Sequence, residues 1–114
     1  MSIIIYTDGA CSGNPGTGGW GGVIIEPNND PVHLSGGKDL TTNNQMELTA
    51  AIKVLQYFQK SEKIKIYTDS KYLMNGIEIW INNWKKNGWK TASKKPVKNK
   101  ELWEKLDSLI GKHI

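Results

Sequence analysis

The sequence predicts a single domain of the α/β class over residues 1–114, in which a mixed β-sheet packs against helices. Residues 3–7 form a β-branched run typical of a buried strand, and residues 63–67 alternate polar and apolar side chains as a strand does. Between these runs, apolar residues recur at the 3.6-residue spacing of a helix. This order indicates two strands of one sheet joined by a crossover helix.

The composition is that of a folded domain rather than a disordered chain. Hydrophobic residues make up 38% of the chain and include five Trp, which is enough apolar material for one core. Cys11 is the single cysteine, so no intramolecular disulfide can form and packing must stabilise the fold. No apolar run approaches the roughly 18 residues of a membrane span, and the N-terminus lacks the pattern of a signal peptide. We therefore expect a cytoplasmic protein.

The first third of the chain is predicted to form three strands with short connections. Strands are expected at 3–7, 20–26 and 32–36. The first should end in a turn at Asp8-Gly9. Residues 9–22 contain seven Gly and one Pro, which predicts a tight loop leading into the second strand. The turn-forming residues at 27–31 then make the third strand the return of a hairpin.

The crossover helix begins with a capping signal. Thr42 is followed three residues later by Gln45, which is the spacing of a capping box. Glu47 shares one face of this helix with apolar residues, namely Ala51, Val54 and Phe58. We expect that face to pack on the sheet, which places one carboxylate on an otherwise apolar surface.

The remainder of the chain is predicted to be mainly helical after the strand at 63–67. A helical stretch should run from 70 to about 83, with a break near Gly76. Asn99 is expected to cap a last amphipathic helix, which Gly111 should end. The overall order is therefore three strands, a helix, a strand and two further helical segments.

Two strands end in nearly the same sequence. The tripeptide Tyr-Thr-Asp occurs at 6–8 and again at 67–69. If the two strands pair in parallel, Asp8 and Asp69 emerge side by side at the carboxyl edge of the sheet, where α/β folds place their sites. Glu47 approaches the same edge from the crossover helix. A carboxylate on an apolar face is costly unless it is paired or bound to a metal ion.

Three converging carboxylates without Cys or His favour Mg²⁺ or Mn²⁺ over Zn²⁺. Two such ions about 3.5–4 Å apart can activate a water and stabilise the leaving oxygen of a phosphodiester. Other interpretations remain open at this point. An Asp after a strand is often a turn or helix-capping residue, and Glu47 could be a capping partner or a solvated residue.

Positive charge is concentrated in residues 84–100, which contain seven Lys and no acidic residue. All fifteen basic residues of the chain are Lys, and the chain without this segment has a net negative charge. Trp84 and Trp89 lie within the segment and Trp80 just before it. Lys neutralises phosphates and Trp stacks on bases or sugars, so the segment favours a nucleic-acid partner. The alternative is a solvated loop whose Trp side chains are anchored in the core.

Four motifs together resemble bacterial ribonuclease HI, of the type 1 ribonuclease H family. They are Tyr-Thr-Asp-Gly-Ala-Cys-Ser-Gly-Asn-Pro-Gly at 6–16, Thr-Thr-Asn-Asn-Gln-Met-Glu-Leu at 41–48, Thr-Asp-Ser at 68–70 and Trp-Lys-Lys-Asn-Gly-Trp-Lys-Thr at 84–91. They occur in the family's order and spacing over essentially the whole chain. The resemblance implies a ribonuclease H-like sheet of three antiparallel strands followed by a parallel one. It also implies endonucleolytic hydrolysis of the RNA strand of RNA–DNA hybrids with Mg²⁺, or alternatively Mn²⁺, leaving 5′-phosphate and 3′-hydroxyl ends.

The resemblance also implies roles for individual residues. Asp8, Glu47 and Asp69 match three metal-binding, catalytic carboxylates. The positions matching substrate contacts are Asn14, Asn43, Asn44 and Gln45 for the minor groove, Thr42 and Asn99 for a DNA-strand phosphate, and Trp80, Trp84, Lys85 and Lys86 for the basic protrusion and DNA channel. Leu40 stands where relatives often carry Arg, which should weaken the phosphate pocket.

Relatives in this family continue with a fifth strand, a loop bearing a His and a helix with a fourth carboxylate. The sequence given ends at Ile114, so we expect a domain without that last strand and helix. Fewer carboxylates should weaken the binding of at least one metal ion. The alternatives to an active nuclease are a hybrid-binding module with little turnover and a subunit completed by strand pairing. The family is monomeric, but an exposed edge at the 63–69 strand would favour a dimer.

Overall fold

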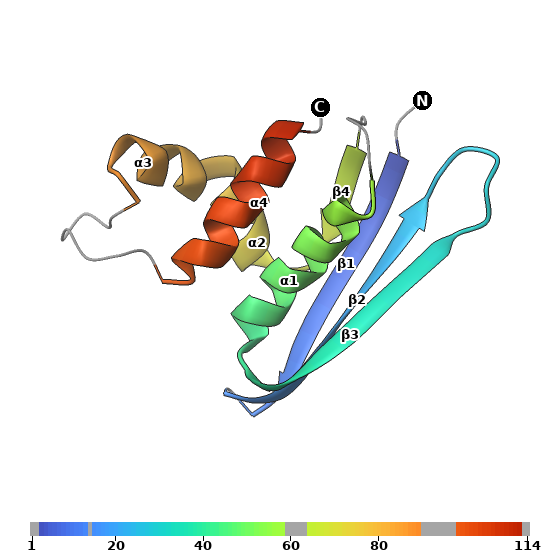
Figure 1. Cartoon of the computed structure of the whole chain (residues 1–114), viewed down its shortest axis with the longest axis horizontal. Helices are drawn as coiled ribbons and strands as arrows, with labels where there is room; N and C mark the ends of the chain where they lie inside the picture. Colours follow the sequence, from blue (N-terminus) through green and yellow to red (C-terminus); the bar gives the residue numbers. More distant parts are fainter. Residues whose placement is uncertain (1–2, 14, 59–63, 90–97, 113–114) are drawn as a thin grey trace.

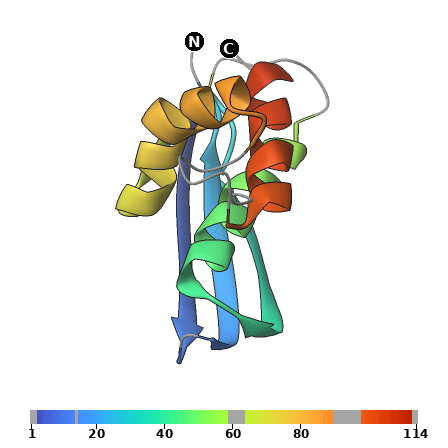
Figure 2. The same cartoon turned by 90° about the vertical axis from the view of Figure 1, so that its left-hand side faces the viewer.

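The computed structural model describes residues 3–13, 15–58, 64–89 and 98–112. Its described helices lie together beside one four-stranded sheet (Figure 1), and the view turned by 90° shows α1 and α4 in front of the strands (Figure 2). No helix in the described part of the chain is long and apolar enough to span a membrane.

The sheet has the mixed topology that the sequence predicts. Its strands are β1 (Ile3–Ser12), β2 (Gly16–Ile25), β3 (Val32–Thr41) and β4 (Ile64–Thr68), in the spatial order β3-β2-β1-β4. The first three pair antiparallel, and β4 pairs in parallel with β1. This arrangement confirms the α/β class and the ribonuclease H-like sheet, because the crossover through α1 makes β1 and β4 parallel neighbours.

The first three strands are longer than predicted. The glycine-rich segment expected to be a loop is mostly β-structure, with β1 and β2 paired as far as Ser12 and Thr17. Its glycines give α1 room to lie close to the sheet. An added Cβ at Gly9 would lie 2.5 Å from the backbone carbonyl carbon of Met46. Gly9, Gly18 and Gly22 therefore reflect the packing of α1 on the sheet, whereas the glycine-rich composition predicts turns.

Helix α1 (Asn43–Gln56) begins as predicted, because the Thr42 hydroxyl accepts a hydrogen bond of 3.1 Å from the backbone N–H of Gln45. Its apolar side, which includes Leu55, is buried in the main core together with Ile5 of β1 and Ile24 of β2. The predicted sheet-facing side, with Ala51, Val54 and Phe58, is buried in that core.

The second half of the chain contains α2 (Lys71–Asn75), the π-helical segment η1 (Gly76–Trp80), α3 (Ile81–Lys86) and α4 (Lys100–Lys112). The break predicted near Gly76 is instead a change of helix type, since the backbone there stays right-handed helical. Gly111 does not end the last helix, which continues to Lys112. Asn99 does occupy the capping position of α4, because its carbonyl accepts the first helical hydrogen bond, from Trp103.

Aromatic side chains join these helices into one unit. The ring of Trp103 is fully buried and lies within 5.2 to 6.5 Å of three others, namely Tyr72, Trp80 and Trp84. Gly76 faces the same ring so closely that an added Cβ would overlap it. The η1 turn therefore depends on a residue without a side chain at this point.

Replacing Gly76 with Ala should lower the free energy of unfolding by about 1–3 kcal/mol, the usual cost of overpacking a core. Urea denaturation monitored by Trp fluorescence measures this change. Gly19→Ala is the matched control, because the nearest atom to its added Cβ is 3.4 Å away. Equal destabilisation by the two substitutions would contradict the packing of Gly76 on Trp103.

Candidate active site

Asp8 and Asp69 lie side by side on neighbouring parallel strands. The pairing between β1 and β4 ends at Thr7 and Thr68, and each of these residues is followed directly by one of the two Asp residues. Thr7 is buried whereas Asp8 and Asp69 are exposed, because side chains alternate between the faces of a sheet. A surface hollow of about 400 Å³ is lined by both aspartates together with Tyr6, Thr7, Tyr67 and Thr68. The predicted neighbourhood is confirmed, although Asp8 lies within β1 rather than after its end.

Glu47 reaches this region from the second turn of α1. Its Oε1 accepts a hydrogen bond of 3.1 Å from the backbone N–H of Gly9, the residue that follows Asp8. Its Oε2 is buried and has no hydrogen-bond partner among the described residues. One carboxylate oxygen therefore fixes the side chain to β1, while the other is an unsatisfied buried acceptor.

The charges of the three carboxylates interact. Burial raises the pKa of Glu47 above its ordinary value, and the negative charges of Asp8 and Asp69 raise it further. The hydrogen bond from Gly9 opposes both effects by favouring the ionised form. The site thus concentrates negative charge around a half-buried carboxylate, which a cation would stabilise.

The donor set suits a hard divalent cation. All three side chains offer oxygen atoms only, as Mg²⁺ and Mn²⁺ prefer, and Glu47 Oε2 is an orphaned buried acceptor. Among the residues that the structure describes, no group of three or more His, Cys, Asp or Glu is already arranged as a metal-binding set. The three carboxylates therefore fit such an ion in the chemistry of their oxygen atoms and in their electrostatic interaction.

The predicted substrate contacts at the start of α1 lie in two environments. Asn43 and Asn44 are exposed, whereas Thr42 and Gln45 are half-buried. The Gln45 side chain does not return to the backbone of Thr42 but donates a hydrogen bond of 3.3 Å to Asn99. The structure thus brings together two candidate residues that are 54 positions apart, a contact that sequence spacing does not signal. Asn14 lies outside the described residues.

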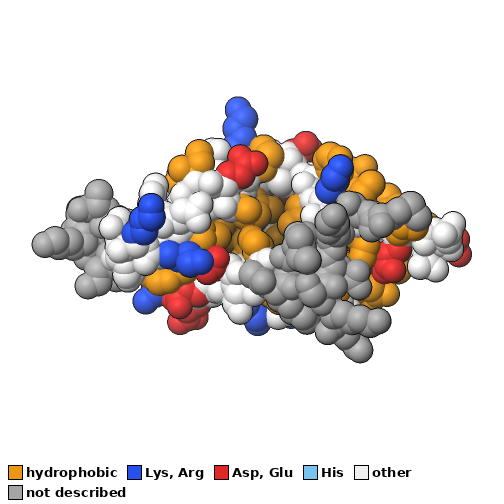
Figure 3. All heavy atoms as spheres, turned by 90° about the horizontal axis from the view of Figure 1, so that it is seen from above, with side chains coloured by type: hydrophobic (Ala, Val, Ile, Leu, Met, Phe, Trp, Pro, Cys, Tyr) orange, Lys and Arg blue, Asp and Glu red, His pale blue; other side chains and the backbone are white. Residues whose placement is uncertain are grey.

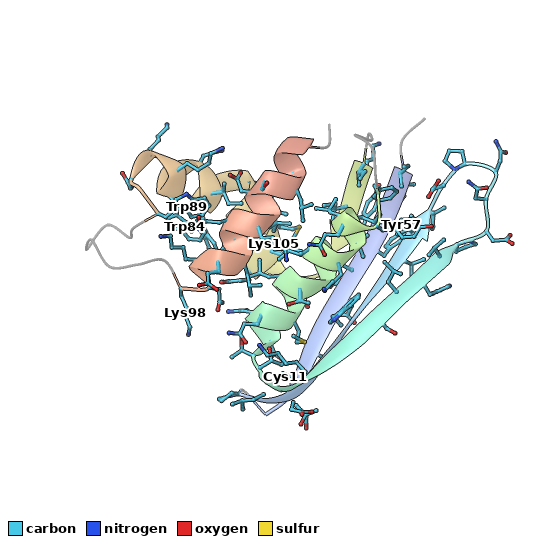
Figure 4. The ribbon with its side chains drawn as sticks, in the orientation of Figure 1. Cys11, Tyr57, Trp84, Trp89, Lys98 and Lys105 are labelled. Atoms are coloured by element: carbon cyan, nitrogen blue, oxygen red, sulfur yellow. The ribbon has the colours of Figure 1, made fainter. Side chains whose placement is uncertain are left out.

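The tryptophan candidates in the helical unit pack against other aromatic rings. Trp80 and Trp84 are half-buried, and their ring centroids lie 5.9 Å apart. Trp84 also contacts Trp89, and Figure 4 shows these two side chains together beside α3. The described structure therefore supports the interpretation of the Trp residues as anchors, with their exposed edges left for contact.

The lysine candidates differ in their surroundings. Lys85 forms an ion pair of 3.5 Å with Asp107 on α4, whereas Lys86 is exposed at the end of α3. Seen from above, the described Lys and acidic side chains are interspersed rather than gathered by sign (Figure 3). The middle of the basic segment, residues 90–97, lies outside the described residues.

A family model named RNase H matches residues 1–114 of the chain. The chain belongs to the ribonuclease H family. It is 61% identical over 112 residues to the ribonuclease H of Francisella philomiragia, covering 98% of this chain and 73% of that protein. It is 60% identical over 111 residues to the ribonuclease H of Francisella tularensis subsp. novicida, covering 97% of this chain and 72% of that protein. The chain is therefore assigned to the ribonuclease H class of enzymes.

Solved ribonuclease H structures share the fold. One is LC9-RNase H1, a type 1 ribonuclease H with the type 2 active-site motif, with a TM-score of 0.82 and 27% identity; 97% of this chain and 58% of that one are covered. Another is LC11-RNase H1 in complex with an RNA/DNA hybrid, with a TM-score of 0.72 and 26% identity. The match covers 99% of this chain and 85% of that one. The resemblance inferred from the four motifs is confirmed at the level of family and fold.

Glu47→Gln should stabilise the metal-free ribonuclease H domain at neutral and alkaline pH. Because the folded-state pKa of Glu47 is raised, the native state binds more protons than the unfolded state, so this group lowers stability as pH rises through that pKa. Gln retains the acceptor for the Gly9 N–H and removes the charge. Melting temperatures measured in EDTA should differ most at pH values well above 4.5, the ordinary pKa of Glu, and converge below it. A difference that stays constant with pH would contradict the charge effect.

Proposed function

We propose that the chain is an endonuclease that hydrolyses the RNA strand of RNA–DNA hybrids, leaving 5′-phosphate and 3′-hydroxyl ends. The observation that carries the proposal is the electrostatic interaction of three neighbouring carboxylates in a ribonuclease H fold. Asp8 lies within β1 and Asp69 directly follows the adjacent parallel strand β4, and Glu47 interacts electrostatically with both. No nucleophilic Ser, Cys or His needs to be invoked, since water can be the attacking group.

The catalytic and metal-binding residues of the proposal are Asp8, Glu47 and Asp69. They would hold Mg²⁺, or alternatively Mn²⁺. When bound, such an ion supplies Lewis-acid stabilisation of the phosphate and an activated water. The chain's own contribution is to orient the oxygens: Gly9 fixes Glu47 through its N–H, and the β1–β4 register fixes the two aspartates.

The substrate surface in this proposal begins at the start of α1. Asn43 and Asn44 are exposed there, and their amides can donate to and accept from the 2′-hydroxyls that distinguish RNA from DNA. Asn14 and Gln45 complete the proposed minor-groove set. The bound hybrid in the LC11-RNase H1 structure supports this class of ligand.

A hollow of about 500 Å³ beside the start of α1 fits a backbone phosphate. Its lining offers ammonium groups and amides: the residues are Lys38, Thr41, Gln45, Met46, Thr49, Asn99, Lys100, Glu101 and Leu102. We assign the DNA-strand phosphate to its rim, near Thr42 and Asn99. Leu40 is 67% exposed and brings no charge, whereas Lys38 and Lys100 do.

The remaining part of the proposed hybrid surface is the basic protrusion, which begins with η1 and α3. Trp80 and Trp84 anchor it, and Lys85 and Lys86 lie at the end of α3. Because the Asp107 carboxylate already neutralises part of the charge of Lys85, we expect Lys86 to contribute more to phosphate binding.

Asp8→Asn should lower the rate of hybrid cleavage in Mg²⁺ by about 100-fold or more, because it removes a charged oxygen ligand from a metal-assisted reaction. The measurement is cleavage of a 5′-labelled RNA strand annealed to DNA, resolved by gel electrophoresis. Asp39→Asn, an exposed acid on β3, is the control and should cleave at the unaltered rate.

Three outcomes separate the possibilities. Equal cleavage by the two variants would overturn the assignment of Asp8. Hybrid binding without cleavage by the unsubstituted chain, in Mg²⁺ and at every Mn²⁺ concentration, would replace catalysis with a binding role. Cleavage of single-stranded RNA at the same rate would remove the specificity for hybrids.

Lys86→Ala should weaken hybrid binding regardless of sequence and reduce the slope of log K against log salt concentration by about one, as expected for the loss of one phosphate contact. Fluorescence anisotropy of a labelled hybrid at several salt concentrations measures both quantities. Lys53→Ala, in the last turn of α1, should leave the slope unchanged. An unaltered slope for Lys86→Ala would place that residue outside the interface.

A further inference from the structure

Five side chains from four elements form a continuous chain of hydrogen bonds, here called the polar relay. Thr41 Oγ1 donates to Gln45 Oε1 at 2.9 Å, and Gln45 Nε2 donates to Asn99 Oδ1 at 3.3 Å. Asn99 Nδ2 donates to Tyr72 Oη at 3.2 Å, and Trp103 Nε1 donates to the same oxygen at 3.0 Å. The polar relay therefore joins the end of β3 to α1, to the residue that caps α4, and to α2.

The two ends of the polar relay are fixed by burial. Thr41 is 2% exposed and Trp103 is completely buried, so neither side chain has room to change rotamer. The amides between them, Gln45 and Asn99, are half-buried and line the proposed phosphate hollow. Immobile ends thus orient the two amides that a ligand in the hollow would meet.

Asn99 is held in an unusual conformation. Its φ angle is 60°, in the left-handed region, and both ends of its amide are engaged within the polar relay. A side-chain amide nitrogen carries two hydrogens, and the bond to Tyr72 uses one of them. The second N–H of Asn99 is oriented by this bond, since the planar amide cannot turn without breaking it.

Tyr72 connects this arrangement to the catalytic edge of the sheet. Its ring packs against Trp80 at 5.6 Å and Trp103 at 5.2 Å between centroids, which restrains the position of its hydroxyl. Helix α2 (Lys71–Asn75), which carries Tyr72, is capped by Ser70, the residue that follows Asp69. The hydroxyl that holds Asn99 is therefore rigidly linked to the segment that follows a catalytic carboxylate.

We propose that Tyr72 is a positioning residue for hybrid binding. Its hydroxyl sets the orientation of the Asn99 amide, so that the second N–H of Asn99 meets a backbone phosphate held beside Lys38 and Lys100. The inference rests on the proposed function, since the phosphate belongs to the hybrid. A donor oriented before binding loses less conformational freedom when the ligand arrives, which strengthens the contact.

The test is Tyr72→Phe, which removes one oxygen and keeps the aromatic packing. The dissociation constant of a fluorescent RNA–DNA hybrid, measured in EDTA so that no metal or turnover is needed, should rise about five-fold, because the released Asn99 side chain must then be ordered on binding. Tyr57→Phe is the matched control, because Tyr57 is exposed beyond the far end of α1 from the hollow (Figure 4) and its substitution should not change binding. Melting curves of both variants verify that they are folded at the assay temperature.

A double-mutant cycle separates positioning from general loosening of the structure. In the Asn99→Ala background, Tyr72→Phe should cause no further loss of affinity, because the group that it positions is absent. Equal losses in the two backgrounds, or no loss from Tyr72→Phe while Asn99→Ala weakens binding, would overturn the inference and leave the proposed function intact. Failure of the unsubstituted chain to bind hybrid would overturn both. Hybrid binding with a coupled cycle but no cleavage in Mg²⁺ would support the inference and contradict the proposed catalysis.

Discussion

The close contact between α1 and β1 at Gly9 is the constraint on which the candidate site depends. The backbone of α1 lies so near to Gly9 that any side chain there would collide with Met46. The same approach brings the Gly9 N–H within 3.1 Å of Glu47 Oε1. Because Asp8 directly precedes Gly9, the contact that packs the helix on the sheet also sets two of the three carboxylates near each other. The third, Asp69, is placed by the parallel pairing of β4 with β1.

The surface proposed to hold the hybrid depends on a second, aromatic constraint. Trp80, Trp84 and Trp103 pack together, and this packing joins η1 and α3 to α4. The ion pair between Lys85 and Asp107 also spans α3 and α4, but its lysine is 53% exposed. Exposed pairs contribute at most about 1 kcal/mol, so the aromatic contacts dominate. The tryptophans thus hold together the helices from which Lys85 and Lys86 extend.

Sequence reasoning succeeded where a residue's role is set by local periodicity or by strand register. The Thr42 cap, the buried face of α1 and the neighbouring positions of Asp8 and Asp69 all follow from spacing along one element or across one crossover. Sequence reasoning failed where tertiary contacts determine the local structure. The glycines of residues 9–22 indicate a loop, but most of them lie in β1 and β2, and three of them, Gly9, Gly18 and Gly22, leave room for α1. Gly76 indicated a break, but the helix continues as a π-helical segment against Trp103.

The polar relay was beyond sequence analysis for a related reason. Its contacts join Gln45 to Asn99 and Asn99 to Tyr72 across separations of 54 and 27 residues, and no periodicity links such positions. Gln45 and Asn99 were identified by resemblance, whereas Tyr72 carries no motif at all. Its role becomes visible only through the atoms that its hydroxyl meets.

The energetically unfavourable features of this domain lie near the proposed substrate-binding surface. Glu47 places a carboxylate in a partly buried position with one unsatisfied oxygen, and Asn99 adopts a left-handed backbone conformation. A left-handed residue alone does not indicate a site, since Asn28 has the same conformation in the turn between β2 and β3, where Asn is favoured. Asn99 differs because its side chain is engaged at both ends and lines a hollow with two lysines. Asn99 combines an unfavourable backbone conformation with oriented hydrogen-bond donors. Glu47 combines burial with concentrated negative charge. Neither combination is expected in a sequence selected for stability alone. Asn99 contacts Gln45, and Glu47 lies two residues further along α1. The start of α1 is therefore the part of the fold that would connect the proposed binding with the proposed catalysis.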